Sequence, residues 1–375
     1  MTKTVSNDDK KRRRLRIVRR FEIAFVVLMV VGLIAVGASC IGLKKTFDNG
    51  GYSEEWTDGV DGTTLHDIAY GERPWEVMNV YVPKTLDPSK VNGAILFIHG
   101  GAWVGGSRSE QQGFARYMAK EGWLTANMEY MLYNNKLSED EKKDYSVFKV
   151  LDEIDMALAK LKEVGAERGY NVEKVALSGH SAGGHLTMLY GYTYKTRDGA
   201  NPPVDVAFIV PRVGPSDFFS EKILPRDVQD VSDRKLKSGL DFLSFMSGVA
   251  VTPQDFRERR DFVEKTARSI SPAAQVADAP VPTLAAFGGK DSLVPETVHG
   301  QALVQEFRKF DAKEIADAPA DVSDTLTFDY LVFPNSGHML AEDVDYVQRW
   351  RDLFKTYADR YLGTVVDDGE KEEKE

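Results

Sequence analysis

The chain has 375 residues, of which 42% are hydrophobic and 28% charged, a globular composition rather than a disordered one. Its formal net charge of −10 is unevenly distributed: residues 1–45 hold eleven Lys/Arg and three Asp/Glu, so the remaining residues carry −18. Such an acidic body repels polyanions, which excludes nucleic acid as a partner.

The first predicted element is a membrane-spanning helix over residues 23–43. These residues carry no charge, and as a helix they would span roughly 31 Å, enough for the hydrocarbon core of a bilayer. The segment before it, 1–22, contains the basic run 10–14, whereas only Lys44 and Lys45 follow. The positive-inside rule therefore predicts a cytoplasmic segment 1–22, a single-pass anchor in the cell membrane and an extracytoplasmic domain.

Three other interpretations of this apolar segment compete with the anchor: a cleaved signal peptide, a lipoprotein, and a buried helix of a soluble domain, which would rarely be apolar all round beside so dense a basic cluster. Residues 36–38 are weakly permissive for signal-peptide cleavage, although the apolar run continues beyond them. Cys40 would be the attachment point of a lipoprotein, but Gly37 stands where such signals usually have a large aliphatic residue. Because Cys40 is the one cysteine of the chain, no disulfide can form in the rest of it.

Beyond a polar, Gly-containing linker at 44–60, apolar runs of strand length alternate with helical periodicities. Strands alternating with helices indicate an α/β fold, a mostly parallel central sheet with helices on both faces, in one domain over 44–365. The predicted strands are 75–82, 94–98, 123–130, 175–177, 204–210, 283–287 and 328–333. The predicted helices are 150–165, 182–194, 295–313 and 341–361.

Residues 217–270 interrupt this rhythm with an apolar cluster followed by a charged, helix-like run at 256–268. We expect an insertion packed over one end of the sheet, serving either as a cap that shapes a substrate site or as a decoration of the fold. The acidic tail at 366–375 is expected to be solvated.

The clearest catalytic motif is G-x-S-x-G at residues 179–183, directly after a predicted strand and before a predicted helix. A sharp turn there would present the hydroxyl of Ser181, with glycines where side chains would clash. The helix start also aims free N–H groups at the reacting centre. Ser181 is therefore the candidate nucleophile.

A second motif, His-Gly-Gly-Ala-Trp at 99–103, follows another buried strand. Glycines at this point would allow backbone N–H groups to approach a developing oxyanion. Gly100, Gly101 and Ala182, the residue after the nucleophile, are the candidate oxyanion-hole residues.

A serine hydroxyl needs a base, and the base needs an orienting acid. Of the six histidines, His338 lies just after the last predicted strand, where a loop can bring it over the serine. Asp291 follows the preceding strand, and the order Ser181, Asp291, His338 suits this kind of site. Asp217, after an earlier strand, is the alternative acid. No histidine pair stands in a recognisable metal-ligand motif, so we predict neither a metal nor a cofactor.

Together these motifs resemble the α/β-hydrolase superfamily over about residues 80–361. Within it, the chain is similar to esterases and lipases with an H-G-G-x-W motif, near feruloyl and acetyl-xylan esterases, hormone-sensitive-lipase-like esterases and kynurenine formamidase. The resemblance implies an acyl-serine mechanism, with Trp103 and His180 lining the substrate pocket. Two departures are Phe287, where a His is common, and Met131, where an Arg usually follows the Tyr.

The expected function is hydrolysis of a short acyl or carbohydrate ester outside the cell. An amidase or peptidase using the same residues is an alternative, although the chain has no room for the additional propeller or large cap domain that such peptidases usually carry. A non-catalytic surface binding protein is the other alternative, against which the complete set of catalytic residues argues.

Overall fold

The described residues of the computed structural model belong to one compact unit, Ser53–Glu375. They are 54–134, 136–218, 233–277, 280–310 and 328–363. The predicted anchor at 23–43 and the acidic tail at 366–375 lie outside them. Among the helices that are described, none combines the length and the hydropathy that crossing a bilayer requires.

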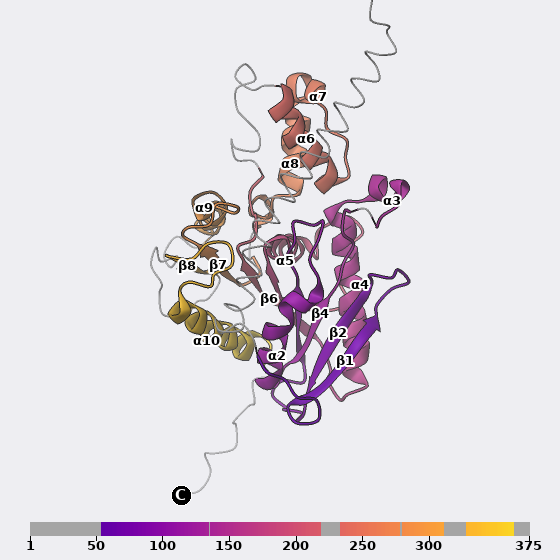
Figure 1. Ribbon diagram of the computed structural model, residues 1–375, viewed down its shortest axis with the longest axis vertical. Helices are drawn as coiled ribbons and strands as arrows, with labels where there is room; N and C mark the ends of the chain where they lie inside the picture. Colours follow the sequence, from indigo (N-terminus) through magenta and orange to yellow (C-terminus); the bar gives the residue numbers. More distant parts are fainter. Residues whose placement is uncertain (1–53, 135, 219–232, 278–279, 311–327, 364–375) are drawn as a thin grey trace, which may run out of the picture. The chain divides into compact units, whose positions relative to one another are not determined.

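A central sheet organises the unit (Figure 1). Its strands are β1 (Gly62–Ala69), β2 (Val77–Pro83), β3 (Gly93–Ile98), β4 (Leu124–Met128), β5 (Lys174–His180), β6 (Asp205–Arg212), β7 (Thr283–Gly288) and β8 (Phe328–Phe333). In space they follow the order β1-β2-β4-β3-β5-β6-β7-β8. The pairs β1–β2 and β2–β4 are antiparallel and the others parallel, so the predicted mostly parallel sheet is confirmed.

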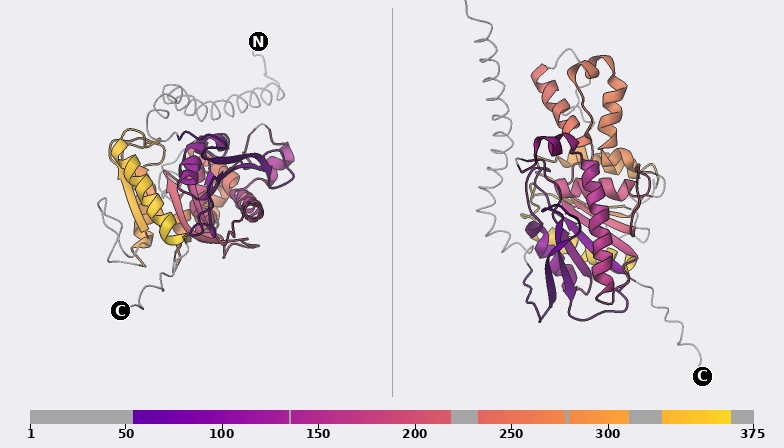
Figure 2. Two further views of the ribbon diagram at one scale, coloured as in Figure 1. Left: turned by 90° about the horizontal axis from the view of Figure 1, so that it is seen from below. Right: turned by 90° about the vertical axis from the view of Figure 1, so that its right-hand side faces the viewer.

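Helices cover both faces of this sheet (Figure 2). Phe208 of β6 packs against Phe354 on one face, whereas the next residue, Ile209, lies against Gly191 on the other. Consecutive side chains of a strand point to opposite faces, which explains why β3 and β7 are buried along their whole length and are apolar apart from Thr283. The first face carries α2 (Gln112–Lys120) and α10 (Val344–Tyr361), and the second α4 (Val147–Ala166), α5 (Ala182–Thr193) and α9 (Glu296–Phe307).

The sequence pattern did not predict β1 or α2. β1 is an edge strand with a half-exposed sequence, so it lacks the apolar run that marks the central strands. α2 has nine residues and buries only its inward face, which is too short a segment for helical periodicity to stand out. Predicted helix 295–313 ends earlier, because α9 stops at Phe307 and residues 311–313 lie outside the described part.

The predicted insertion contains α6 (Asp233–Ser247), α7 (Pro253–Glu258) and α8 (Arg260–Ser269), followed by the 3₁₀ turn η2 (Pro272–Gln275). A capping box starts α7: the Thr252 hydroxyl accepts the N–H of Asp255, and the Asp255 carboxylate accepts the N–H of Thr252. The three helices pack on one another and on α4 and η2, beyond the carboxyl ends of the central strands (Figure 1).

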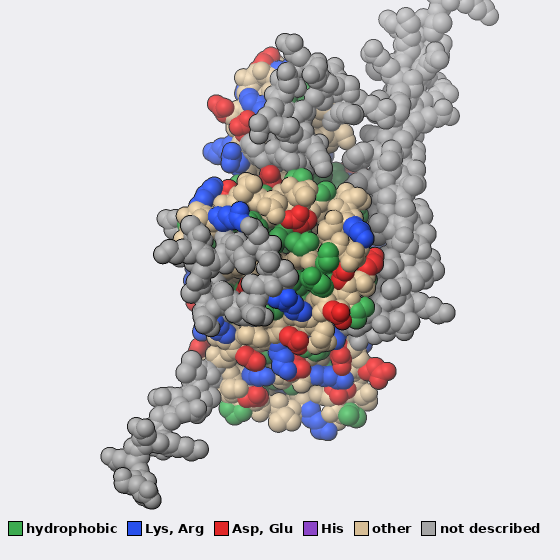
Figure 3. Space-filling model, turned by 90° about the vertical axis from the view of Figure 1, so that its left-hand side faces the viewer, with side chains coloured by type: hydrophobic (Ala, Val, Ile, Leu, Met, Phe, Trp, Pro, Cys, Tyr) green, Lys and Arg blue, Asp and Glu red, His purple; other side chains and the backbone are tan. Residues whose placement is uncertain are grey.

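Acidic and basic side chains are interspersed on the face drawn in Figure 3. The large apolar residues that are exposed on the described surface are scattered along the chain rather than gathered in one segment: Val60, Leu86, Met156, Val249, Leu293, Phe310 and Val344.

Candidate active site

The turn between β5 and α5 carries Ser181 in a strained backbone conformation, with φ 55° and ψ −118°. The flanking glycines explain how the turn can be so tight. A Cβ at Gly179 would lie 2.2 Å from the Gly183 carbonyl oxygen, and one at Gly183 would lie 2.1 Å from that of Ile98. Only hydrogen fits at either position, so the G-x-S-x-G spacing is a steric requirement of this turn.

Three side chains from distant parts of the chain form a continuous hydrogen-bonded line. His338 Nε2 lies 2.9 Å from Ser181 Oγ, and His338 Nδ1 lies 2.7 Å from Asp291 Oδ2. Since an ionised carboxylate can only accept, Nδ1 carries the proton that it donates to Asp291, which leaves Nε2 free to accept from the serine. The structure thus brings together the predicted nucleophile, base and acid.

Asp291 is held from its other side by the chain that follows it. Its Oδ1 accepts the backbone N–H groups of Leu293 and Val294, at 2.8 and 3.0 Å, and the residue is only 6% exposed. The alternative acid, Asp217, does not contact His338 in this way: its N–H is directed to His299 Nδ1, 3.2 Å away. The geometry therefore selects Asp291 as the partner of His338.

The segment that carries His338, between β8 and α10, has no regular secondary structure and is fixed by specific bonds. Ser336 Oγ donates to Asp343 at 2.7 Å, and the Ser336 carbonyl accepts the N–H of Lys290 at 3.0 Å. The His338 carbonyl accepts a hydrogen bond from His180 Nε2 at 3.0 Å. These contacts hold both ends and the middle of the loop.

The predicted oxyanion loop lies against the serine turn. A Cβ at Gly100 would stand 3.3 Å from the Cβ of Ser181, so the Gly100 backbone borders the predicted nucleophile. The next residues reverse the chain with positive φ angles, 107° at Gly101, 52° at Ala102 and 60° at Trp103. Ala182 is the first residue of α5, where helix N–H groups have no intrahelical acceptor. Backbone donors at these positions are suited to binding an oxyanion.

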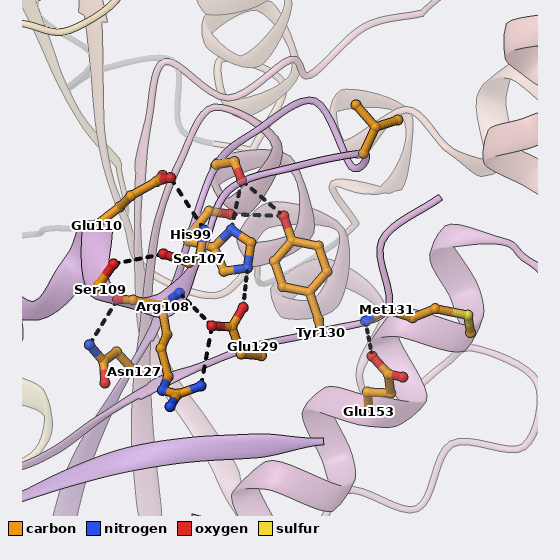
Figure 4. A network of polar contacts seen from close by, with 12 residues as sticks. His99, Ser107, Arg108, Ser109, Glu110, Asn127, Glu129, Tyr130, Met131 and Glu153 are labelled. Carbon is orange, nitrogen blue, oxygen red and sulfur yellow. Dashed lines mark hydrogen bonds and ion pairs between the residues drawn. The ribbon is translucent and has the colours of Figure 1, made fainter. Parts of the chain in front are cut away.

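Buried polar side chains support this loop from beneath (Figure 4). His99 is fully buried, donates from Nδ1 to the Gly100 carbonyl at 2.7 Å and stacks on Tyr130, with ring centroids 4.3 Å apart. The Tyr130 hydroxyl donates to the His99 carbonyl at 3.0 Å. Glu129 Oε2 lies 3.3 Å from His99 Nε2, and its Oε1 accepts from the guanidinium of Arg108 at 3.2 Å.

The ionisation of Glu129 follows from these neighbours. Partial burial opposes its charge, but the His99 ring beside it and the backbone N–H and guanidinium of Arg108 outweigh that effect, so the pKa of this carboxyl lies below its ordinary value. Arg108 in turn pairs with Asp67 of β1. The oxyanion loop is thereby connected through charged groups to the antiparallel edge of the sheet.

A second buried carboxyl lies on the other side of Tyr130 (Figure 4). Glu153 of α4 accepts the N–H of Met131 at 2.7 Å and the indole N–H of Trp75 at 2.8 Å. Despite these donors, burial raises the pKa of Glu153 from 4.5 to about 7. Met131, the residue that departs from the family pattern, is thus bound through its backbone N–H, which any residue except proline would offer.

The two predicted pocket residues have different surroundings. Trp103 is 5% exposed and packs edge-to-face on His185, with centroids 5.1 Å apart, and on Phe242 of α6 at 6.0 Å. Phe218, near the start of the insertion, also contacts this indole. His180 instead faces the His338 loop, with ring centroids 5.2 Å apart. The insertion therefore packs on the oxyanion loop through aromatic side chains.

Sequence reasoning missed the polar residues below the oxyanion loop, chiefly Arg108, Glu129 and Glu153. One signal for Glu129 was present, because a carboxylate directly follows the fully buried strand β4. Buried carboxylates need partners, and no rule of spacing identifies those partners along the chain. Arg108 lies twenty-one positions before Glu129, and Glu153 lies on a helix beyond it.

Comparison with known proteins supplies the family. The BD-FAE family model matches residues 78–306. Esterase LipC of Mycobacterium tuberculosis is 28% identical over 273 residues, which cover 72% of this chain and 58% of LipC. The chain thus spans less than two thirds of that relative.

Solved structures agree with the fold. Esterase B of Lactobacillus rhamnosis superposes with a TM-score of 0.59 at 18% identity, covering 89% of this chain and 95% of that one. A truncated carbohydrate esterase from gut microbiota gives 0.58 at 15% identity, covering 82% and 99%. Identities this low establish the α/β-hydrolase fold and nothing finer. The family match extends over more than half of the chain, and on that ground the protein belongs to the BD-FAE family.

Proposed function

We propose that this protein is a serine hydrolase that cleaves carboxylic esters through a covalent acyl-serine intermediate. The observation that carries the proposal is the hydrogen-bonded line from Ser181 through His338 to Asp291, on a strained turn beside free backbone donors. Its membership of the BD-FAE family and its similarity to esterase LipC support the same reaction class.

In the first half of the proposed reaction, His338 Nε2 takes the hydroxyl proton as Ser181 Oγ attacks the ester carbonyl carbon. The carbonyl oxygen becomes an oxyanion, which the N–H groups at Ala182 and in the Gly100–Gly101 turn stabilise. The carbon–oxygen bond to the alcohol then breaks, and the imidazolium of His338 returns the proton to the departing alkoxide. Asp291 stabilises this imidazolium through Nδ1.

In the second half, water attacks the acyl-serine and gives its proton to His338. The second tetrahedral intermediate collapses, Ser181 recovers its proton, and the carboxylic acid leaves. No cofactor enters this scheme, since every proton moves between the substrate, water, Ser181 and His338.

The proposed substrate is a short acyl or carbohydrate ester. Trp103 and Phe242 of the insertion contact each other near the oxyanion loop. Their flat, apolar rings would form one side of the proposed substrate site. One structural neighbour is a carbohydrate esterase, which points in the same direction. A panel of p-nitrophenyl esters of increasing chain length, acetylated sugars and feruloyl esters would identify the acyl and alcohol groups.

We also propose a location outside the cell, with residues 23–43 as a membrane anchor. The support is the length of this uncharged segment and the basic cluster before it. Protease treatment of intact cells, followed by fractionation, tests the proposal. Digestion of the catalytic domain with retention of a small membrane-bound fragment is expected, and full protection of the domain would contradict it.

The decisive experiment for the activity uses the full chain in detergent. It should hydrolyse p-nitrophenyl acetate and react covalently with a fluorophosphonate, and Ser181→Ala should lose the labelling and lower kcat by about 10⁶-fold. Turnover by Ser181→Ala equal to that of the wild type would contradict the proposal. The matching p-nitroanilide distinguishes an amidase, and a wild-type chain inert in all these assays would indicate a binding protein.

A further inference from the structure

The residue before the nucleophile, His180, is not used by the mechanism above, yet it contacts the segment that carries the base. Its Nε2 lies 3.0 Å from the carbonyl oxygen of His338. A carbonyl can only accept, so His180 must carry its proton on Nε2 and donate it. The two rings meet edge-to-face, with centroids 5.2 Å apart.

This hydrogen bond joins the two halves of the catalytic centre. His180 is the last residue of β5 and precedes Ser181, so its ring has a fixed position relative to the nucleophile. His338 belongs to an irregular loop, whose backbone is free to rotate where no bond holds it. His180, fixed on the β5 turn, donates to the His338 backbone. This bond holds His338 Nε2 at 2.9 Å from Ser181 Oγ.

The surroundings of His180 keep its ring neutral. Burial, then the charges of His338 and Arg212, hold the pKa of His180 well below its ordinary value. Arg212 lies beside His180 in the pairing of β5 with β6, and its guanidinium stacks over Phe114, 4.0 Å from the ring centroid. A permanent cation beside the ring opposes a second proton there.

Neutrality matters for the proposed reaction, because His338 must itself become positive in each half of it. A second imidazolium 5 Å away would oppose that charge, whereas a neutral donor leaves it unopposed. The neutral ring also retains a single tautomer, with Nε2–H directed at the His338 carbonyl.

We propose that His180 is a positioning residue, which holds the His338 loop in register with Ser181 through the bond from its Nε2–H to the His338 carbonyl. This inference rests on the proposed ester hydrolysis. It gives His180 a role different from the substrate contact that the sequence suggested.

Three variants of the full chain in detergent test it. His180→Leu fills the position with an apolar side chain and removes the donor, whereas His180→Gln keeps an N–H near the position of Nε2. His66→Leu, on the exposed face of β1, is the matched control. We expect His180→Leu to lower kcat by about 10- to 100-fold, because a base misplaced by about 1 Å costs that much. KM should stay within about twofold, since no substrate contact is lost.

His180→Gln should recover most of the lost kcat, and His66→Leu should match the wild type. Rates are expressed per fluorophosphonate-reactive site, so that a partly unfolded preparation does not mimic the effect. A rise in KM with kcat unchanged, unchanged kinetics in His180→Leu, or a Gln variant as slow as the Leu variant would each overturn the role. A wild-type chain without turnover or labelling would instead overturn the proposed function.

Discussion

The serine turn at 179–183 and the oxyanion loop at 99–106 follow neighbouring strands and meet at the same edge of the sheet, but they are stabilised differently. The serine turn is fixed by backbone atoms: Gly179 and Gly183 lie so close to carbonyl oxygens that no side chain fits. The oxyanion loop also contains left-handed residues, yet its position depends on polar side chains, the buried His99 and Tyr130 and the half-buried Glu129.

This difference has a physical consequence. Steric contacts between backbone atoms do not change with pH or salt, so the serine turn should keep its geometry wherever the protein is folded. A loop held by buried ionisable groups depends on their protonation and on the match of charges. We therefore expect shape-changing substitutions to act most strongly on the turn and charge-changing substitutions to act on the loop.

The largest effect is expected at Gly183. A methyl group there would lie 2.1 Å from the Ile98 carbonyl oxygen, so Gly183→Ala should cost about 3 kcal/mol of unfolding free energy and abolish turnover. Gly105→Ala, in the oxyanion loop, is the matched control, because the nearest atom to its Cβ would be 3.9 Å away. Urea unfolding and ester turnover measure both. Equal behaviour of the two variants would contradict the steric account of the turn.

The next largest effect is expected at Glu129. Glu129→Gln preserves shape but removes the charge opposite His99 and Arg108, and we expect it to lower the free energy of unfolding by about 2 kcal/mol. Displacement of the Gly100 backbone should also lower kcat about tenfold. Asp241→Asn, which removes the partner of Lys237 in an exposed pair, should change neither quantity measurably. Unaltered stability and kcat in Glu129→Gln would show that the loop does not need this charge.

A third prediction concerns the pH dependence of stability at Glu153. The unfolded carboxyl loses its proton near pH 4.5 and the folded one near 7, so between these values the folded state binds more protons. Stability should therefore fall as pH rises through this window, by up to about 1.4 kcal/mol per pH unit from this group, and level off above it.

Glu153→Gln cannot ionise and should flatten that slope. Denaturant unfolding from pH 4.5 to 8 measures it, with Glu139→Gln as a control at an exposed carboxyl on α3 (Glu139–Asp144). The same slope in both variants and the wild type would mean that Glu153 keeps its charge in the folded protein.

The smallest expected effect on stability is at Phe242, which contacts Trp103 from the insertion. Phe242 is only partly buried, so Phe242→Ala should cost about 1 kcal/mol. If the insertion shapes the substrate site, KM should rise for bulky esters while the rate of fluorophosphonate labelling stays unchanged. Val249→Ala, at an exposed residue just after α6, is the control. Unchanged KM values across an ester panel would indicate that the insertion does not shape the substrate site.

The sequence alone was sufficient to predict the parallel sheet, the serine turn and the base. The apolar runs of β3, β5 and β7 are buried on both faces. Such runs predict a parallel sheet even when the strands that pair with them are unknown. The serine turn and the choice of His338 likewise follow from local rules: glycines where side chains clash, and a histidine after the last strand.

Only the tertiary structure decided which distant groups meet. Asp291 and Asp217 both follow strands, and the bond to His338 Nδ1 distinguishes them. The pairing of Arg108 with Glu129, and of His180 with the His338 backbone, likewise depends on how strands and loops are brought together. Steric rules act between neighbours in the chain and can be read from it. Charges and hydrogen bonds act between neighbours in space, which the order of residues does not reveal.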